Sequence, residues 1–527
     1  MQKYSRYILY VVLVTALLSA CQKKDDQQGG ANAGAKPVEI TVEVFDRGTD
    51  GGKTDPANNE WTKWIQEKVL KDENIIVKFK KVPRWEEVEA LNAMVAAGDL
   101  PDVCLSYSSE LIANYRDLGG LFDMAPHVDT TLKDLKAFLG PDTALPGRDL
   151  IRRNENPQTK QIFSIPARRT NVAMRNMFIR KDWLDKLGMP LPTTTEEFYA
   201  ALKAFKEQDP GNVGRDRVVP FIMTNNAFWG LQTIAYAFID PNISRKERWT
   251  HIVVDRYLLV PGYKEGIRFA NRMFNEGLID PDFPLHKEDD VYNAIKSGVV
   301  GAYSDNWDMI YRESQAILSD LQKNVPDAEM VPVDCLTGAA SYSHKSAYDP
   351  AGVNFFVPVT SKNPEAALRY VNWLARFENY NFLQIGPEGV THEVVDGVPK
   401  IKTVTGPWIQ NSPQNIDYTY HINGLDLNDE AKNARALASG YPWPAEIIEN
   451  SYNIAMNNAA PDPVVPVPLS AAGPVMQTLT DRSNVILTQA VTSSPANFEQ
   501  VWERGIQEWL SSGAQAVVDE RIEKYFE

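Results

Sequence analysis

The stretch VEITVEVFD, residues 38–46, alternates apolar and polar side chains, which is typical of a β-strand. IIVKFKKV, residues 75–82, predicts a second strand, and PDVCLSY, residues 101–107, predicts a third. A helix is expected to begin near Trp61, and another to end at Gly98, a fitting C-terminal cap. The resulting order β-α-β-α-β indicates an open α/β sheet.

Helix signals continue further along the chain. Residues 181–187 predict a short helix that ends at Gly188. Thr193 with Glu196 has the spacing of a capping box at the start of the next helix. Asn363 is expected to cap a later helix that has proline at its first position.

The N-terminus predicts export and a lipid anchor. A basic start is followed by an apolar run over residues 7–18, which is short for a membrane span of roughly 20 residues. LSAC, residues 18–21, resembles the bacterial lipobox, in which the peptide is cut before a cysteine that carries the lipid. We therefore expect a signal peptide over residues 1–20, a lipidated Cys21 and a flexible linker to residue 37. The expected location is the periplasmic or extracellular face of a bacterial membrane.

Composition limits the class of protein and its partners. The 527 residues, 43% of them hydrophobic, can form two or more domains. The formal charge is −15, and the first 20 residues contribute two basic and no acidic side chains, so the remaining chain is still more acidic. This charge argues against a nucleic-acid partner. Cys104 and Cys335 could form a disulfide, although the apolar surroundings of Cys104 favour a buried thiol.

The sequence contains no recognisable catalytic motif. His-Glu-x-x-His, Gly-x-Ser-x-Gly and Cys-x-x-Cys are all absent. Acidic residues are close together at residues 280–282 and 288–290, where a solvated turn is the favoured interpretation. A pair of carboxylates facing a cleft, as in a glycosidase, stays open as an alternative.

Several segments together resemble one protein family. They are AAGDLPDV (96–103), FIRKDWLDKLGMPLPTTTEEF (178–198), PGYKEGIRFANRMFNEGLIDPDF (261–283), IKSGVVGAYSDNW (295–307), SKNPEAALRYVNWL (361–374) and IGPEGVTHEVVDGVP (385–399). In this order they resemble the family 1 extracellular solute-binding proteins of bacterial ABC importers. The chain is most similar to their long lipoprotein branch, which includes binders of alginate-type oligosaccharides.

The resemblance implies a fold and a division into domains. The fold is α/β and of the periplasmic-binding-protein type II, with two lobes joined by a hinge and a ligand cleft between them. We expect lobe 1 to contain residues 38–166 and about 350–405, and lobe 2 to contain residues 167–349 and about 406–527. Crossings between lobes are expected near residues 165–178 and 344–354, with a third after IGPEGV.

One segment departs from the family pattern. Many members of this branch have a calcium loop where this chain has DPGNVGRDRVVP, residues 209–220. Gly211, Val213 and Arg217 replace three oxygen ligands, whereas calcium needs six to eight. We expect no cofactor; Asp209, Asn212 and Asp216 are the candidates if a distorted calcium site persists.

Candidate ligand-binding residues are expected where strands end and lobes cross. Aromatic rings cover the apolar faces of sugars, and polar side chains bind the hydroxyl edges. Trp307 is the preferred candidate, because its polar neighbours indicate an exposed loop. The full set is Asp46, Arg47, Tyr107, Ser108, Arg168, Trp229, Asp305, Asn306, Trp307, Glu388, Trp408 and Trp443.

These observations predict a monomeric, lipid-anchored receptor without catalytic activity. It captures a carbohydrate, expected to be an oligosaccharide, and delivers it to an ABC permease. The alternatives are an exported carbohydrate-active enzyme and a surface scaffold without ligand. The charge of the sugar stays open: Arg47, Arg84, Arg168 and Arg169 would suit a uronate or sulfated glycan if they faced the cleft.

Overall fold

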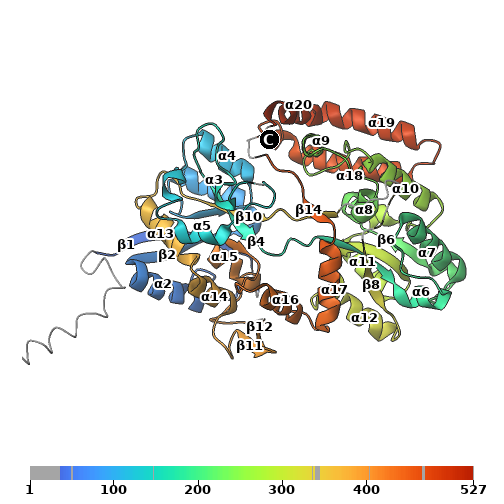
Figure 1. Ribbon diagram of the computed structural model, residues 1–527, viewed down its shortest axis with the longest axis horizontal. Helices are drawn as coiled ribbons and strands as arrows, with labels where there is room; N and C mark the ends of the chain where they lie inside the picture. The colour runs from blue at the N-terminus through green and yellow to red at the C-terminus, as the bar shows by residue number, and fades with distance from the viewer. Residues whose placement is uncertain are drawn as a thin grey trace, which may run out of the picture.

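The chain forms two α/β lobes that lie side by side in the computed structural model (Figure 1). The structure describes residues 36–525, apart from 49–50, 146, 335, 337, 339–344, 403 and 466–468. The two-lobed α/β class predicted from sequence is confirmed. Cys21, Cys335 and His344 lie outside the described residues, so the lipid anchor and the cysteine pairing stay predictions. Cys104 is buried and forms no disulfide with any described residue.

The sheet of lobe 1 is built from strands that are far apart in sequence. β1 and β2 pair in parallel, and a backbone hydrogen bond of 2.9 Å from Glu43 to Val103 joins β1 to the segment that leads into β3. In spatial order the strands are β2 (Ile75–Pro83), β1 (Val38–Asp46), β3 (Cys104–Ser106), β10 (Ala351–Phe356), β4 (Ile165–Arg169) and β13 (Ile422–Asn423).

Helices of lobe 1 pack around this sheet over one large hydrophobic core. Its largest buried side chains include Trp61 and Trp373. The helices are α2 (Glu60–Glu73), α3 (Glu87–Ala97), α4 (Ser109–Asp117), α5 (Lys133–Leu139), α13 (Pro364–Leu374), α14 (Phe377–Ile385) and α15 (Ile416–Thr419). A hairpin of β11 (His392–Val395) and β12 (Val398–Ile401) follows α14.

Lobe 2 has a four-stranded sheet in the order β6-β7-β5-β8. The strands are β6 (Val219–Ile222), β7 (Val300–Asn306), β5 (Arg175–Arg180) and β8 (Met330–Val333). β5 lies antiparallel to both neighbours, and β6 runs parallel to β7. The beginning of β5 and the ends of β6, β7 and β8 therefore share the edge from which the chain crosses to lobe 1.

Two clusters of buried side chains form the core of lobe 2, one of which includes the C-terminal helices. The helices are α6 (Lys181–Leu187), α7 (Thr195–Gln208), α8 (Ala227–Tyr236), α9 (Arg245–His251), α10 (Tyr263–Asn275), α11 (Glu288–Lys296), α12 (Ile317–Asn324), α17 (Ala445–Met456), α18 (Met476–Thr492), α19 (Phe498–Trp509) and α20 (Gln515–Lys524). Figure 1 shows α18, α19 and α20 gathered at one end of this lobe. Among all described helices, none is long and apolar enough to cross a membrane.

The chain crosses between the lobes several times. It leaves lobe 1 after β4 and enters lobe 2 with β5, and it returns through β9 (Lys345–Ala347) into β10. After β13 it reaches lobe 2 through α16 (Glu430–Ser439). β14 (Ala459–Pro461) pairs in parallel with β9 and so reinforces one crossing.

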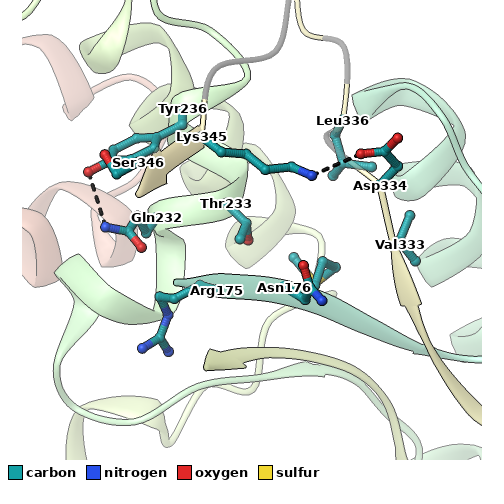
Figure 2. Close-up of a pocket in the computed structure, with 11 residues that line it drawn as sticks. Arg175, Asn176, Gln232, Thr233, Tyr236, Val333, Asp334, Leu336, Lys345 and Ser346 are labelled. Atoms are coloured by element: carbon teal, nitrogen blue, oxygen red, sulfur yellow. Dashed lines mark hydrogen bonds and ion pairs between the residues drawn. The ribbon is translucent and has the colours of Figure 1, made fainter. Parts of the chain in front are cut away.

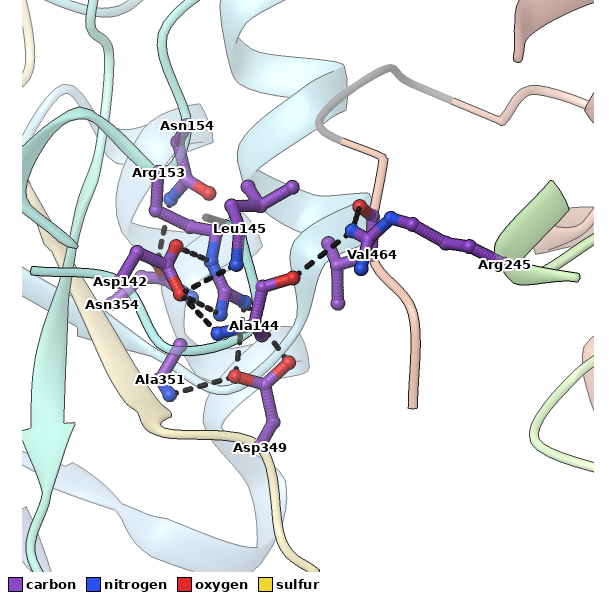
Figure 3. Close-up of polar contacts among 10 residues, drawn as sticks. All are labelled: Asp142, Ala144, Leu145, Arg153, Asn154, Arg245, Asp349, Ala351, Asn354 and Val464. Atoms are coloured by element: carbon purple, nitrogen blue, oxygen red, sulfur yellow. Dashed lines mark hydrogen bonds and ion pairs between the residues drawn. The ribbon is translucent and has the colours of Figure 1, made fainter. Parts of the chain in front are cut away.

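A side chain of lobe 2 also contacts lobe 1 directly (Figure 3). Arg245 of α9 donates to the backbone oxygens of Ala144 in lobe 1 and of Val464 after β14, both at 3.0 Å. The loop that carries Ala144 is held by Asp142, whose carboxylate accepts from the Ala144 N–H at 3.0 Å and pairs with Arg153. The lobes are therefore linked by a hydrogen bond in addition to the crossings.

Most local predictions are confirmed, and two need correction. Gly98 and Gly188 cap their helices in the left-handed conformation, as predicted. The capping box uses Thr194 and Glu197 rather than Thr193 and Glu196, because the helix begins one residue later than expected. Asn363 occupies the N-cap position of α13 and proline follows it, as predicted, but its side chain makes no capping hydrogen bond and donates instead to the Glu39 carbonyl at 3.1 Å.

The expected boundary of lobe 1 near residue 405 is also wrong. Tyr418 and Tyr420 are fully buried in the lobe 1 core, and the Tyr420 hydroxyl donates to the Glu43 carbonyl at 2.7 Å. Lobe 1 therefore continues to β13. The expectation failed because the chain makes an additional excursion through the hairpin before it returns to this core.

Candidate functional site

A cavity of about 890 Å³ lies between the two lobes. Such a volume is within the range of about 300 to 1,000 Å³ that is typical of small-molecule sites. Lobe 1 contributes β12 and the turn before α15, lobe 2 contributes the segment after β7 together with α17, and the crossing after β4 contributes backbone and side chains. Residues on these walls include Thr170, Asn171, Asp308, Arg312, Ile401, Gln414, Glu430, Arg435, Tyr441, Glu449, Tyr452 and Asn453.

Helix α16 forms a large part of the wall and connects the lobes. Ala436 packs in a small cluster with Val398 and Leu427 beside lobe 1, whereas Ala438 is buried in a core cluster of lobe 2. Small side chains along this helix leave room for the cavity in front of it. A ligand in the cavity would therefore contact elements that belong to both lobes.

Two tyrosines supply aromatic surface to the cavity. Tyr441 and Tyr452 line it, and the Trp307 ring packs edge-on behind both, with centroid separations of 6.0 and 5.3 Å. Burial raises the pKa of Tyr441, and the nearby Asp308 carboxylate raises it further, so its hydroxyl stays protonated. Burial likewise raises the pKa of Tyr452. Aromatic rings held in this way can cover the apolar face of a sugar.

One charged cluster faces the cavity beside the tyrosines. Arg312 donates through Nε and Nη2 to the two carboxylate oxygens of Asp308, both at 2.9 Å. The Tyr441 hydroxyl donates to the same carboxylate at 2.7 Å. The Arg312 side chain remains 36% exposed, and within the described residues its Nη1 group has no hydrogen-bond acceptor, so it is the group that could donate to a ligand oxygen. The ion pair holds the Arg312 guanidinium in one orientation, and the Asp308 carboxylate balances its positive charge.

A second, much smaller pocket lies where β9 meets lobe 2 (Figure 2). Its volume is about 20 Å³, which is enough for about one water molecule. Lys345 at its rim donates to Asp334 at 2.8 Å. This pocket is too small for a sugar, so the larger cavity is the candidate ligand site.

The structure corrects the interpretation of Trp307. Its side chain is only 3% exposed, not in an exposed loop as expected. Tyr441 and Tyr452, which come more than a hundred residues later, cover it. Its placement makes it a support for the rings that face the cavity.

Several candidate residues of lobe 1 are engaged within the protein. Arg47 pairs with Asp417 through Nε and Nη2, at 2.7 and 2.9 Å. Ser108 caps α4 by accepting from the Leu111 N–H at 3.1 Å. Arg168 donates to the Phe138 carbonyl at 2.8 Å and forms an ion pair with Asp426.

The remaining candidates of this lobe lie at strand ends. Asp46 accepts from the Gly48 N–H at 3.0 Å. Tyr107 stacks on Phe45 with a centroid distance of 6.1 Å, and the Arg84 guanidinium lies 4.1 Å from the Tyr107 ring.

Three candidates of lobe 2 gather at the edge of its sheet. Asp305 accepts from the Tyr292 hydroxyl at 3.1 Å and lies 3.5 Å from Arg175. Trp229 is half-buried, with the Arg175 guanidinium 5.6 Å from its ring centre. Asn306 accepts from the hydroxyl of Tyr348, at 3.4 Å, in the crossing before β10.

The last three candidates are dispersed. Trp408 packs edge-on against Trp61 at 4.9 Å, and Trp443 donates to the Tyr311 carbonyl at 3.1 Å. Glu388 is exposed in the turn before β11. None of the candidates predicted from sequence is among the residues that line the cavity.

The turn after α7 does not fit a calcium loop. Both carboxylate oxygens of Asp209 accept backbone N–H groups, from Val213 at 2.9 Å and Gly214 at 2.8 Å. Gly211, Val213 and Arg217 offer no side-chain carboxylate or amide oxygen. In the described part of the chain, no three His, Cys, Asp or Glu side chains are grouped as metal ligands would be.

Sequence reasoning missed Arg312, Tyr441 and Tyr452. Tyr441 lies two residues before the predicted Trp443, and Arg312 follows Trp307 by five residues. The sequence therefore identified the segments that contain these residues. Which side chain of each segment faces the cavity depends on how α16 and α17 pack.

A model of bacterial extracellular solute-binding proteins matches residues 55–379. The chain belongs to this family. Polygalacturonan/rhamnogalacturonan-binding protein YtcQ of Bacillus subtilis strain 168 is 20% identical over 540 residues, covering 98% of each chain. The family consists of binding proteins, and this chain is a solute-binding protein rather than an enzyme.

Solved structures of related proteins share the fold. An HMO-binding, ABC-transporter-associated solute-binding protein from Bifidobacterium longum infantis ATCC 15697 has a TM-score of 0.64 and 19% identity, covering 93% of this chain and 99% of that one. Alginate-binding protein AlgQ2 has a TM-score of 0.60 and 18% identity, covering 93% and 98%. At these identities the likeness concerns the fold.

Proposed function

We propose that the protein captures an oligosaccharide between its lobes and delivers it to an ABC importer. The observation that carries this proposal is the interlobe cavity of about 890 Å³, with Tyr441 and Tyr452 beside the paired Asp308 and Arg312. Aromatic faces next to fixed hydrogen-bonding groups suit a ring that has apolar faces and hydroxyl edges. The names of the similar proteins, which refer to polygalacturonan and rhamnogalacturonan, HMO and alginate, support a saccharide ligand.

The lobed construction supports a role in delivery. A ligand that contacts both lobes favours a closed arrangement, because it binds that arrangement more tightly than an open one. A transporter can then distinguish the loaded protein from the empty one by its shape. Lipidation of Cys21 would keep the protein at the membrane near its permease and raise its effective concentration there.

Binding is tested with the purified protein and a panel of neutral and acidic oligosaccharides, by calorimetry. Tyr452→Ala should weaken any binding up to about tenfold, since stacking on an aromatic ring contributes roughly 0.5–1.5 kcal/mol. Phe377→Ala, which removes a partly exposed ring from α14, is the matched control and should bind normally. A scaffold without ligand would show no binding to any oligosaccharide.

The anchor is tested separately by membrane fractionation. Cys21→Ser should release the protein from the membrane fraction without changing its affinity for ligand. Retention of this variant in the membrane would contradict a lipid on Cys21.

A further inference from the structure

We infer that the interlobe cavity selects an uncharged saccharide over a uronate or sulfated one. This inference rests on the proposed function of the same cavity and concerns the class of its ligand. Its basis is the pairing of the charged side chains in and around the cavity.

Arginines that could bind an anionic sugar are mostly neutralised by carboxylates of the protein. The pairs are Arg47 with Asp417 at 2.7 Å, Arg84 with Glu87 at 2.9 Å, and Arg168 with Asp426. A guanidinium that holds a carboxylate in this way has few remaining donors for a second anion. Arg169 has no such ion pair within the described residues, but it lies over the Tyr348 ring and does not line the cavity.

On the cavity wall this rule holds for one of two arginines, because Arg435 forms no ion pair within the described residues. Arg312 is held by both oxygens of Asp308, so the pair has no net charge. Arg435 is the other cationic residue on the wall. Glu430 and Glu449 also line the cavity, and within the described residues neither forms an ion pair. The wall therefore has one more carboxylate than guanidinium groups.

An anionic ligand would meet an unfavourable environment here. Its charged groups would lose water and come close to Glu430 and Glu449, neither of which is held in an ion pair within the described residues. Charges of the same sign repel, and the repulsion grows where the protein excludes water. An uncharged sugar needs only ring faces and hydrogen bonds, which Tyr441, Tyr452 and the Arg312 Nη1 group can supply. Such a site rejects a uronate by repulsion while it binds the neutral ring.

The test compares ligands that differ only in charge. Oligogalacturonides and their methyl esters have the same backbone, and the similar Bacillus subtilis protein is named for polygalacturonan binding. Calorimetry is run with the intact protein and also with neutral galacto-, fructo- and malto-oligosaccharides. We expect the neutral ligands to include a binder, and the methyl ester to bind at least about tenfold more tightly than the free acid.

Variants that remove the carboxylate charges of the cavity wall test whether repulsion causes the selectivity. Glu430→Gln with Glu449→Gln should reduce the preference for the methyl ester, so that the ratio of the two affinities falls towards one. Glu446→Gln, on the same helix as Glu449 but away from the lining residues, is the matched control. The inference is overturned if the free acid binds as tightly as its ester or more tightly, although the proposed function would then stand. Failure of every oligosaccharide to bind would remove the proposed function and the inference together.

Discussion

Two arginine–carboxylate clusters lie at the junction of the lobes and use the same chemistry in different surroundings. Arg153 is only 5% exposed, and all its nitrogens are occupied by Asp142 and Asp349 (Figure 3). Arg312 pairs with Asp308 through two nitrogens, remains 36% exposed and keeps Nη1 available. The first cluster has no capacity for a ligand, whereas the second presents a fixed donor to the cavity. Burial and spare donors, rather than residue type, distinguish a structural cluster from a binding one.

The largest effect is expected at the buried cluster. Arg153→Ala should lower the free energy of unfolding by about 3–5 kcal/mol, because it leaves Asp142 buried without its cation. The change is measured by urea denaturation. Arg152→Ala is the control: its ion pairs are more exposed, so the loss should stay below about 1 kcal/mol. Equal losses in the two variants would contradict the distinction.

For the cluster of Arg312 and Asp308 in the cavity, the larger effect should be on ligand affinity and the smaller one on stability. Arg312→Ala should weaken oligosaccharide binding about 10- to 100-fold, equal to roughly 1.4–2.7 kcal/mol, and lower stability by less than Arg153→Ala, because the Tyr441 hydroxyl still donates to Asp308. Arg272→Ala removes a similarly exposed ion pair on α10 and should leave affinity unchanged. Calorimetry and thermal unfolding of both variants separate the two effects. A large loss of stability with unchanged affinity would assign Arg312 to structure.

Glu43 is a buried carboxyl that forms no ion pair within the described residues, so its pH dependence can be compared with that of the two paired clusters. Burial raises the pKa of Glu43 well above its ordinary value; the Leu105 N–H opposes this shift, while Glu87 and Asp417 add to it. The proton is therefore bound more tightly in the folded than in the unfolded protein. Relative to Glu43→Gln, the wild type should lose stability as pH rises above about 4.5, by at most about 1.4 kcal/mol per pH unit.

Urea denaturation of both proteins between pH 4 and pH 8 measures this difference. The stability curves should diverge with rising pH. Parallel curves would show that Glu43 titrates equally in the folded and unfolded states.

The smallest effect is expected where Arg245 links the lobes. Arg245→Gln should cost about 1 kcal/mol or less, the usual contribution of such hydrogen bonds, and should increase the separation of the lobes. Small-angle scattering of the ligand-free protein measures this separation. Arg215→Gln, at an exposed site within lobe 2, is the control. An unchanged radius of gyration would show that the crossings alone fix the lobes.

The sequence predicted the elements that depend on neighbouring residues. Alternating residues in β1 and the left-handed glycines after α3 and α6 are local signals, and the structure confirms them. The boundary of lobe 1 was misplaced because Tyr418 and Tyr420 return to its core after the excursion through β11 and β12. A local sequence pattern does not show which hydrophobic core a segment joins.

The candidate site, like the boundary of lobe 1, depends on contacts between segments that are far apart in sequence. Asp308 directly follows the predicted Trp307, and Tyr441 lies two residues before the predicted Trp443, so the right segments were identified. The orientation within each segment was not, because Trp307 is covered by rings from α17 and from the segment that precedes it. Side-chain direction at an interlobe surface is set by packing between the lobes.

Hydrogen exchange with and without a bound oligosaccharide tests the central claim most directly. If the ligand lies in the interlobe cavity, protection should increase in both walls, at residues 308–312 of lobe 2 and 430–453 across α16 and α17, and at residues 399–414 of lobe 1. Protection confined to one lobe, or to strand ends such as residues 84–108, would contradict capture between the lobes at this cavity.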